Sequence, residues 1–452
     1  MKKIIVLLLT VILCALVFVS CGTPKTTEAL MAKIDKKMDS LDSYEADMTA
    51  NFSTNLSGYR CTADFTGKNI VSGVKSGKYY YYDSMDGVTE IKDTEKNETV
   101  ESVTSKSVNA FHDGNMFVQN EQGDIQQRLY SPLTAEEYIA YREKQSGAFD
   151  IDFESCVNKT FARNEDKSWT LNYSGYTKKT IDEIVEQFGM EDLFEEEVED
   201  MEITIHANSD YTAKEMDIRF VFANGSTNSD FRMNAKYDKY NEAIPIVDTL
   251  DTSSYWKVAD CRLLTDIEDM LEDLEEKENG SFILALSQKL STSFPSYTQT
   301  TEERDVVTYG KKDGKYYYNV KATYDSGVVQ ISYENGKQTV KMSGSTETVD
   351  QTEEEAKAFI SGLINTASYE SVRVTGIEKT TDSIYKIYCK AADNLYKPVF
   401  SSLGSPRNVS QVITITVKDG KITEIENSVF ASATTMAYGT VEFTLTSTND
   451  FS

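Results

Sequence analysis

The sequence predicts an α+β protein made of two tandem repeats, each a curved antiparallel β-sheet with helices packed on its concave face. Several segments alternate apolar and polar residues, as at Ile218, Phe220 and Phe222, which is typical of strands with one buried face. Other segments space apolar residues three or four positions apart, as amphipathic helices do. Similar landmarks recur in the same order about 210 to 240 residues apart, which indicates two copies of one unit.

The length and composition of the chain exclude several classes of protein. Its 452 residues suffice for about two to three domains, and 40% of them are hydrophobic, which is enough for real cores. Asp and Glu (73) outnumber Lys and Arg (46), and the resulting net charge of −27 repels nucleic-acid backbones. Only 2 histidines are present, so we expect neither histidine-based metal sites nor a catalytic triad. No nucleic-acid partner is expected.

The first element is a targeting segment. Residues 1–20 combine Lys2 and Lys3 with the apolar run 4–19 and a small residue before Cys21, which is the pattern of a secretory signal peptide. The apolar run is too short for a stable membrane-spanning helix. No later apolar stretch approaches about 18 residues, so we expect the rest of the chain to be extracytoplasmic.

Residues 18–21, Phe-Val-Ser-Cys, resemble a bacterial lipobox, with Phe18 where leucine is usual. The resemblance implies that Cys21 carries a diacylglycerol, with acyl chains such as palmitate, and becomes the mature N-terminus. Two acyl chains hold a protein on a membrane more firmly than one. We therefore expect an anchor on the extracytoplasmic face of the bacterial cell membrane, with residues 21–27 as a tether. The alternative is an ordinary secretory signal in which Cys21 has no such role.

The two repeats are expected at residues 28–250 and 255–452, on either side of a polar stretch rich in Asp, Thr and Ser. The landmarks keep one order along both repeats, and the alternative is a coincidental similarity of composition. The matched landmarks are Leu30 with Leu264, Tyr79 with Tyr316, Thr134 with Thr352, Trp169 with Tyr385, Phe188 with Leu403, and Ile203 with Ile413.

Each repeat is expected to contain an N-terminal helix, long strands, further helices and a final meander. Thr134 and Thr352 precede acidic residues, which favours an N-cap followed by the first turn of a helix. The expected helices are 30–41, 134–143, 177–188, 264–274, 353–365 and 394–403. The expected strands include 44–52, 79–82, 218–222, 231–237, 316–318, 413–417 and 441–445.

The order of these segments resembles a known group of proteins. A lipobox and tether precede a helix ending in Leu-Asp-Ser-Tyr (41–44), strands with Gly-Lys-Tyr-Tyr (77–80 and 314–317), helices, and a meander with Val-Lys-Asp-Gly-Lys (417–421). This layout resembles Gram-positive envelope lipoproteins related in fold to the LolA/LppX lipid-carrier superfamily. The resemblance implies half-barrel sheets whose mouths are plugged by helices, with a cavity for acyl chains. The tandem arrangement departs from single-domain members, and no residue matches a defined ligand-contact motif.

Two tyrosine clusters are the candidate ligand wall. Strand alternation places Tyr79 and Tyr81 on one face of the first sheet, and Tyr80 and Tyr82 on the other. In the second repeat, Tyr316 and Tyr318 likewise share a face. Tyrosine offers an apolar ring and a polar tip, which suits a cavity wall or a sugar-stacking surface. The alternative is ordinary sheet packing, because aromatic residues favour strands.

Four cysteines remain in the mature chain after Cys21. They are Cys61, Cys156, Cys261 and Cys389, and no CxxC pair occurs, so a zinc site is not expected. Outside the cytoplasm a disulfide between Cys61 and Cys156 is the first candidate, and the alternative is four buried free thiols.

No catalytic motif occurs, and we expect no enzyme, no cofactor and no metal site. The chain lacks GxSxG, HExxH, P-loop, GxGxxG and EF-hand patterns. The acidic run 191–200 lacks the Asp/Asn/Gly alternation of a loop that wraps Ca²⁺, so a solvated face is expected there. His112 and His206 are expected on the surface.

Three functional hypotheses follow from the sequence. The first is a non-enzymatic lipoprotein that holds or carries an apolar, lipid-like ligand. The second is a cell-envelope interaction module that displays an acidic, tyrosine-rich surface to a protein or glycan. The third, least favoured, is a hydrolase with dispersed carboxylates. A void of hundreds of Å³ beside the sheets would distinguish the first from the second.

Overall fold

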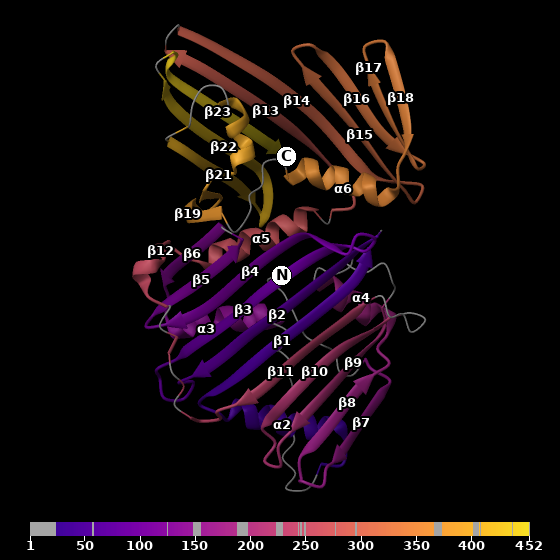
Figure 1. Ribbon diagram of the computed structural model, residues 1–452, viewed down its shortest axis with the longest axis vertical. Helices are drawn as coiled ribbons and strands as arrows, with labels where there is room; N and C mark the ends of the chain where they lie inside the picture. Colours follow the sequence, from indigo (N-terminus) through magenta and orange to yellow (C-terminus); the bar gives the residue numbers. More distant parts are fainter. Residues whose placement is uncertain are drawn as a thin grey trace. The chain divides into compact units, whose positions relative to one another are not determined.

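The structure is a computed structural model in which the chain divides into two units, Met1–Tyr255 and Trp256–Ser452 (Figure 1). The units are described separately. The described residues are 24–451, apart from 57, 124, 148–154, 188–197, 223–228, 243, 245, 248, 249, 276, 294, 295, 366–372, 401–405, 407 and 436.

Two large sheets carry the architecture, and their strand orders correspond. The 12-stranded sheet has the order β12-β6-β5-β4-β3-β2-β1-β11-β10-β9-β8-β7, and the 11-stranded sheet has the order β18-β17-β16-β15-β14-β13-β23-β22-β21-β20-β19. Every pair of neighbours is antiparallel along the first order from β6 through β1 to β7, and along the second order from β18 through β13 to β19. In each unit the first strand lies in mid-sheet, beside both the second strand and the last. Equivalent positions of the two units can therefore be compared directly.

The elements associated with the first sheet are α2 (Thr27–Asp39), β1 (Tyr44–Leu56), β2 (Tyr59–Ser72), β3 (Tyr80–Asp93), β4 (Glu98–His112), β5 (Asn115–Gln122), β6 (Ile125–Pro132), α3 (Ala135–Gly147), β7 (Asn158–Arg163), β8 (Trp169–Ser174), α4 (Lys178–Gln187), β9 (Val198–Ala207), β10 (Ala213–Phe222), β11 (Asp230–Asp238), η2 (Thr252–Ser254) and β12 (Trp256–Lys257).

The elements associated with the second sheet are α5 (Arg262–Glu275), β13 (Gly280–Ser293), β14 (Ser296–Lys312), β15 (Lys315–Tyr324), β16 (Gly327–Glu334), β17 (Lys337–Met342), β18 (Ser345–Asp350), α6 (Glu353–Ile364), β19 (Val374–Thr381), β20 (Ile384–Cys389), η5 (Asp393–Leu395), α7 (Lys397–Phe400), β21 (Asn408–Lys418), β22 (Lys421–Thr435) and β23 (Gly439–Asp450).

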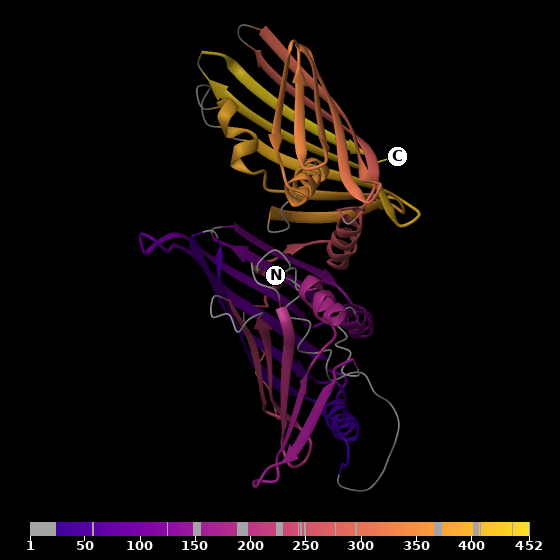
Figure 2. The ribbon, with the colours of Figure 1, turned by 90° about the vertical axis from the view of Figure 1, so that its right-hand side faces the viewer.

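The predicted α+β class is wrong, because the protein is mostly β. Strand makes up 61% of the structure and helix 18%, and long strands dominate both views (Figure 1 and Figure 2). The described helices do not form the predicted layer over a concave face.

The prediction failed because several long strands carry no apolar alternation. The first half of β4 and of β14 is almost entirely exposed, and these segments are rich in Thr, Ser and Glu. A strand needs backbone hydrogen bonds as well as a buried face, and hairpin partners on both sides supply those bonds. Tight turns with residues in the left-handed region, such as Asp113-Gly114 and Asp313-Gly314, keep the hairpins in register.

The main core of the first unit lies between α2 and the central strands. Leu30, Ile34 and Met38 form the buried stripe of α2, and Leu30 and Ile34 are fully buried. They join the inward-facing residues of β1 and β8–β11 in one cluster. The helix begins at Thr26, whose hydroxyl accepts a hydrogen bond from the backbone N of Ala29 at 3.1 Å. This N-cap satisfies one of the free N–H groups at the helix start.

The opposite face of β2–β5 is also buried, which the sequence did not predict. Tyr80 and Tyr82 pack there against Leu250 and Tyr255 of the segment that leaves the sheet. The hydroxyl of Tyr80 accepts a hydrogen bond from the backbone N of Val247 at 3.1 Å. A coil segment therefore covers this face of the sheet.

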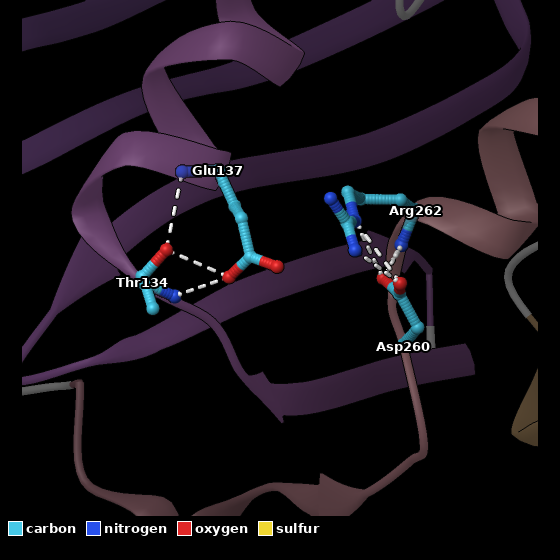
Figure 3. Close-up of polar contacts among 4 residues, drawn as sticks. All are labelled: Thr134, Glu137, Asp260 and Arg262. Atoms are coloured by element: carbon cyan, nitrogen blue, oxygen red, sulfur yellow. Dashed lines mark hydrogen bonds and ion pairs between the residues drawn. The ribbon is translucent and has the colours of Figure 1, made fainter.

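In the second unit, side-chain hydrogen bonds fix the end of α6 and the start of α5. The Asn449 amide, on β23, donates to the carbonyl oxygens of Leu363 and Ile364 at 3.0 and 2.5 Å, which caps α6. At the start of α5, the carboxylate of Asp260 accepts from the backbone N of Arg262 at 2.9 Å and from its guanidinium at 2.7 Å (Figure 3).

The carboxyl of Asp35 generates a prediction on pH and stability. Asp35 lies on the buried side of α2, 3% exposed, and its Oδ1 has no hydrogen-bond partner. Burial, together with Asp39, raises its pKa to about 8. The unfolded chain releases this proton near pH 4 while the folded chain keeps it, so stability falls as pH rises from about 4 to 8.

We expect Asp35→Asn to raise the free energy of unfolding by about 1 to 3 kcal/mol at pH 7.5 and to change it little at pH 4.5. Urea unfolding at both pH values, followed by the fluorescence of buried Trp169, measures the difference. Asp39→Asn, at the exposed end of the same helix, is the matched control and should have the smaller effect. An equal effect of Asp35→Asn at both pH values would contradict the prediction.

Candidate functional site

The candidate tyrosines of the first unit lie beneath helix α3. Tyr81 is on β3, and Tyr79 immediately precedes that strand. The ring centroid of Tyr138 on α3 lies 5.7 Å from that of Tyr81 and 6.2 Å from that of Tyr79. Phe111 of β4 stacks on the same ring at 5.0 Å. Tyr138 is fully buried and Tyr81 is 2% exposed. Because Tyr80 and Tyr82 pack on the other face, the alternation of the two pairs is as predicted.

Helix α3 is positioned by a capping box at its first turn. The Thr134 hydroxyl accepts from the backbone N of Glu137 at 3.2 Å, and the Glu137 carboxylate accepts from the backbone N of Thr134 at 2.9 Å (Figure 3). These reciprocal bonds fix where the helix starts. Tyr138 follows directly in the first turn, so the cap also places its ring on the sheet.

A row of polar side chains crosses the sheet under these rings. Asn69, Asp83 and Asn109 are direct neighbours on β2, β3 and β4. The Asn69 amide donates to the Tyr81 hydroxyl at 3.1 Å and to the Asp83 carboxylate at 3.3 Å. The Tyr138 hydroxyl donates to Asn109 Oδ1 at 2.9 Å. Burial raises the pKa of Asp83 to about 7, against the opposing effects of nearby Arg142 and the Asn69 hydrogen bond.

Arg142 places a charged group in the same interior. It lies one turn after Tyr138 on α3, is 9% exposed, and holds its guanidinium carbon 4.4 Å from the centroid of the Tyr81 ring. Within the described part of the chain, the guanidinium makes neither a hydrogen bond nor an ion pair. A buried cation normally has an acceptor, because removing it from water costs several kcal/mol. The cation–π contact contributes about 2 kcal/mol or more when it is desolvated, and so offsets only part of this cost.

The second unit repeats the aromatic arrangement. Tyr316 and Tyr318 of β15 are 5% and 0% exposed, and the Tyr318 ring lies 5.2 Å from Phe359 of α6 and 5.7 Å from Tyr333 of β16. The Tyr318 hydroxyl accepts from Gln338 at 2.6 Å. Helix α6 also begins at a capping box, between Thr352 and Glu355.

The second unit does not repeat the polar groups. Strand pairing aligns β2, β3 and β4 with β14, β15 and β16, and the two capping boxes align α3 with α6. Every counterpart is aliphatic, so the shared fold does not require a charge or an amide at these positions. The counterparts are Val307 for Asn69, Val320 for Asp83, Ile331 for Asn109 and Ile360 for Arg142.

Sequence reasoning found the tyrosines and missed these polar groups. Arg142 follows Tyr138 at helical spacing, and Asp83 follows Tyr79 and Tyr81 at strand spacing, so the signal was present. Neither residue was singled out from the sequence, because no sequence pattern shows that α3 covers β3. Only the packing of α3 buries them together.

Other predicted site residues lie apart from this interior. Cys61 is on β2 and is a free thiol in the structure, so its bond to buried Cys156 is not formed there and stays a prediction. His112, at the end of β4, lies 3.4 Å from the carboxylate of Asp113. His206 of β9 shares a hydrogen bond of 3.1 Å with the Thr170 hydroxyl.

Several predictions fall on residues outside the described set. They are Cys21, the signal peptide 1–20, part of the acidic run 191–200, and the helix ends at 188 and 401–403. In the described part of the chain, no three His, Cys, Asp or Glu side chains gather into a group that could hold a metal ion. None of the described helices has the length and apolar character to span a bilayer.

Two open grooves lie on the polar face of the first sheet. One, of about 490 Å³, is lined by β1 and β9–β11 and includes Arg219, Arg232 and Lys236. The other, of about 480 Å³, includes His206 and Lys214. Neither contains a candidate tyrosine.

Comparisons with known proteins do not assign the chain to a family. No protein-family model and no curated protein matches it. Among solved structures, the ywiB protein from Bacillus subtilis is 13% identical, covering 40% of this chain and 98% of its own, with a TM-score of 0.13. A putative outer membrane lipoprotein-sorting protein domain from Vibrio parahaemolyticus is 9% identical, covering 41% and 89%, with a TM-score of 0.17.

A Trp-176-Ala mutant of transferrin binding protein B from Haemophilus parasuis is 7% identical, covering 90% of this chain and 75% of its own, with a TM-score of 0.15. The predicted LolA/LppX resemblance therefore has a weak structural neighbour and no sequence-level counterpart. All three TM-scores are far below 0.5, so the chain's own residues must indicate its function.

The polar groups generate a reciprocal prediction on stability. Because Ile360 occupies the Arg142 position in the second unit, we expect Arg142→Ile to raise the free energy of unfolding of the first unit by about 1 to 2 kcal/mol. Ile360→Arg should lower that of the second unit by about 3 to 5 kcal/mol, since it buries a charge in an aliphatic site.

Urea unfolding tests both variants, with Trp169 fluorescence reporting on the first unit and far-UV circular dichroism on the whole chain. Arg60→Ile, at the exposed start of β2, should stay within about 0.5 kcal/mol of the parent. A loss of stability above about 2 kcal/mol in Arg142→Ile would show instead that Arg142 is a structural residue.

Proposed function

We propose that the protein is a lipid-anchored extracytoplasmic lipoprotein, without enzymatic activity, whose first unit binds a lipid-like ligand between α3 and the tyrosine face of β3. The observation that supports this most is the buried polar group set beside Tyr79, Tyr81 and Tyr138, which the second unit lacks. An interior with aromatic walls and a polar end matches the two ends of an amphiphile. The anchor at Cys21 would hold this site next to a membrane.

The energetics of the aromatic interior also favour a ligand of this kind. Burying apolar surface contributes about 25 cal/mol of favourable free energy per Å². An acyl chain that packs against these aromatic rings would bury its own surface in this way. Among the described elements, helix α3 covers Tyr79 and Tyr81, and a modest movement of this helix would open the site. Three of the four candidate tyrosines are buried and Tyr79 is half-buried, which speaks against the display of these residues to a protein or glycan partner.

The anchor is tested by removing the lipidated cysteine. We expect Cys21→Ser to abolish labelling by radioactive palmitate and to release the protein from the membrane fraction, because the thioether bond needs the thiol. Cys14→Ser, within the apolar run of the signal peptide, is the matched control and should keep both the label and the membrane location. Label that persists in Cys21→Ser would overturn the predicted attachment site.

Ligand binding is tested by native mass spectrometry on an anchorless chain that starts at residue 22 and is secreted by its own host. We expect one adduct of lipid mass per chain. Tyr81→Ala should remove it, and Tyr318→Ala, at the same position of the second unit, should keep it. The paired variants lose similar packing, so a difference between them reports on the site.

Two outcomes would contradict the proposal. A parent chain with no adduct would overturn lipid binding and direct attention to the surface of the protein. An adduct that survives Tyr81→Ala and is lost in Tyr318→Ala would move the site to the second unit.

A further inference from the structure

The guanidinium of Arg142 is the most unusual charged group in the described part of the chain. One of its faces lies on the Tyr81 ring, at 4.4 Å from the ring centroid, and its side chain is 9% exposed. Its five N–H donors find no acceptor among the described residues. A guanidinium presents these donors in a planar fork that matches the oxygens of a carboxylate or phosphate.

Hydroxyl groups surround this cation. Tyr44, Tyr79, Tyr81 and Tyr138 all lie close enough to Arg142 to interact with it electrostatically. The hydroxyl of Tyr81 already accepts from Asn69, so its own proton remains available for donation. Tyr79 is half-buried and forms no hydrogen bond to a described residue through its hydroxyl. Each hydroxyl can donate a hydrogen bond, and in the described part of the chain none accepts one from the guanidinium of Arg142.

Two carboxyl groups lie near this cluster. Glu143 is exposed at the surface of α3 and lies close enough to Tyr79 to interact with it electrostatically. Asp83 is buried and interacts with Arg142, yet the two side chains do not form an ion pair. Burial raises the pKa of Asp83 to about 7, against the opposing effect of Arg142. The buried carboxyl does not replace the missing acceptor.

We propose that Arg142, with the hydroxyls of Tyr79 and Tyr81, binds the oxyanion head group of an amphiphilic ligand whose acyl chain lies against the aromatic face beneath α3. This inference rests on the proposed function and specifies its ligand class, an acidic lipid. The second unit, with Ile360 in place of Arg142, does not share this selectivity. The head group is a carboxylate or a phosphate, and both match the donors of the fork.

The test uses three probes with one oleyl chain and different heads: oleate, oleyl phosphate and oleyl alcohol. Each is titrated below its aggregation concentration into the delipidated chain starting at residue 22, with tyrosine and tryptophan fluorescence and calorimetry as readouts. We expect one acid bound per chain, about 10 to 100 times more tightly than the alcohol, which is the range of one charge-assisted hydrogen-bonded contact. The acid that binds more tightly shows whether the preferred head group is a carboxylate or a phosphate.

Three variants locate the anion contact. Arg142→Ile should weaken both acids about 10 to 100-fold and leave the alcohol within about threefold, because only the charged contact is lost. Arg142→Lys keeps the charge and should retain most of the preference for acids. Lys357→Met is the matched control, since Lys357 of α6 lies 5.8 Å from the Tyr316 ring in the second unit, and it should change nothing. Trp169 fluorescence verifies that the first unit of each variant is folded, and far-UV circular dichroism does so for the whole chain.

The outcomes separate this inference from the proposed function. If the alcohol binds as tightly as the acids, lipid binding stands and the anion inference fails. If Arg142→Ile keeps the preference for acids, Arg142 is not the contact and the inference fails. If none of the three probes binds, both the inference and the proposed function are overturned.

Discussion

The structure of each unit depends on the hydrogen-bonded pairing of its first strand with its last. Strand β1 pairs with β11, so that Ala46 lies opposite Tyr237 and Phe52 opposite Phe231. Strand β13 pairs with β23 in the same way. Closing so long a loop costs conformational entropy, and the buried residues that meet along this seam offset the cost. The seam joins two meanders into one sheet and fixes the register on both sides.

The same topology supports two different interiors. In both units a capped helix places an aromatic ring over the tyrosines of the third strand. In the first unit an arginine and a row of amide and carboxyl groups accompany the rings, whereas in the second unit aliphatic side chains fill the same places. A fold that is stable with aliphatic residues has no need of a buried charge. The comparison within one chain therefore distinguishes positions that the sheet requires from the polar positions on which the proposed binding site rests.

Sequence patterns predicted part of the fold and little of the site. Helical spacing located α2, α5 and α6, and the Thr-to-Glu spacing located both capping boxes. Alternation assigned Tyr80 and Tyr82 to the face opposite Tyr81. The α+β class was wrong, because strands such as β4 and β14 are held by backbone pairing and expose many polar side chains. A pattern of apolar residues does not report that kind of strand.

The sequence by itself determined the signal and lipobox pattern, the acidic charge, the order of elements, and the recurrence that the two strand orders share. These features depend on residues close together in the chain, so local spacing records them. Only the tertiary structure decided that coil residues near Tyr255 cover the second face of β2–β5, and that α3 places Arg142 on Tyr81 above Asp83. These contacts join segments separated by many residues, and burial changes the chemistry of a charged group only after they form.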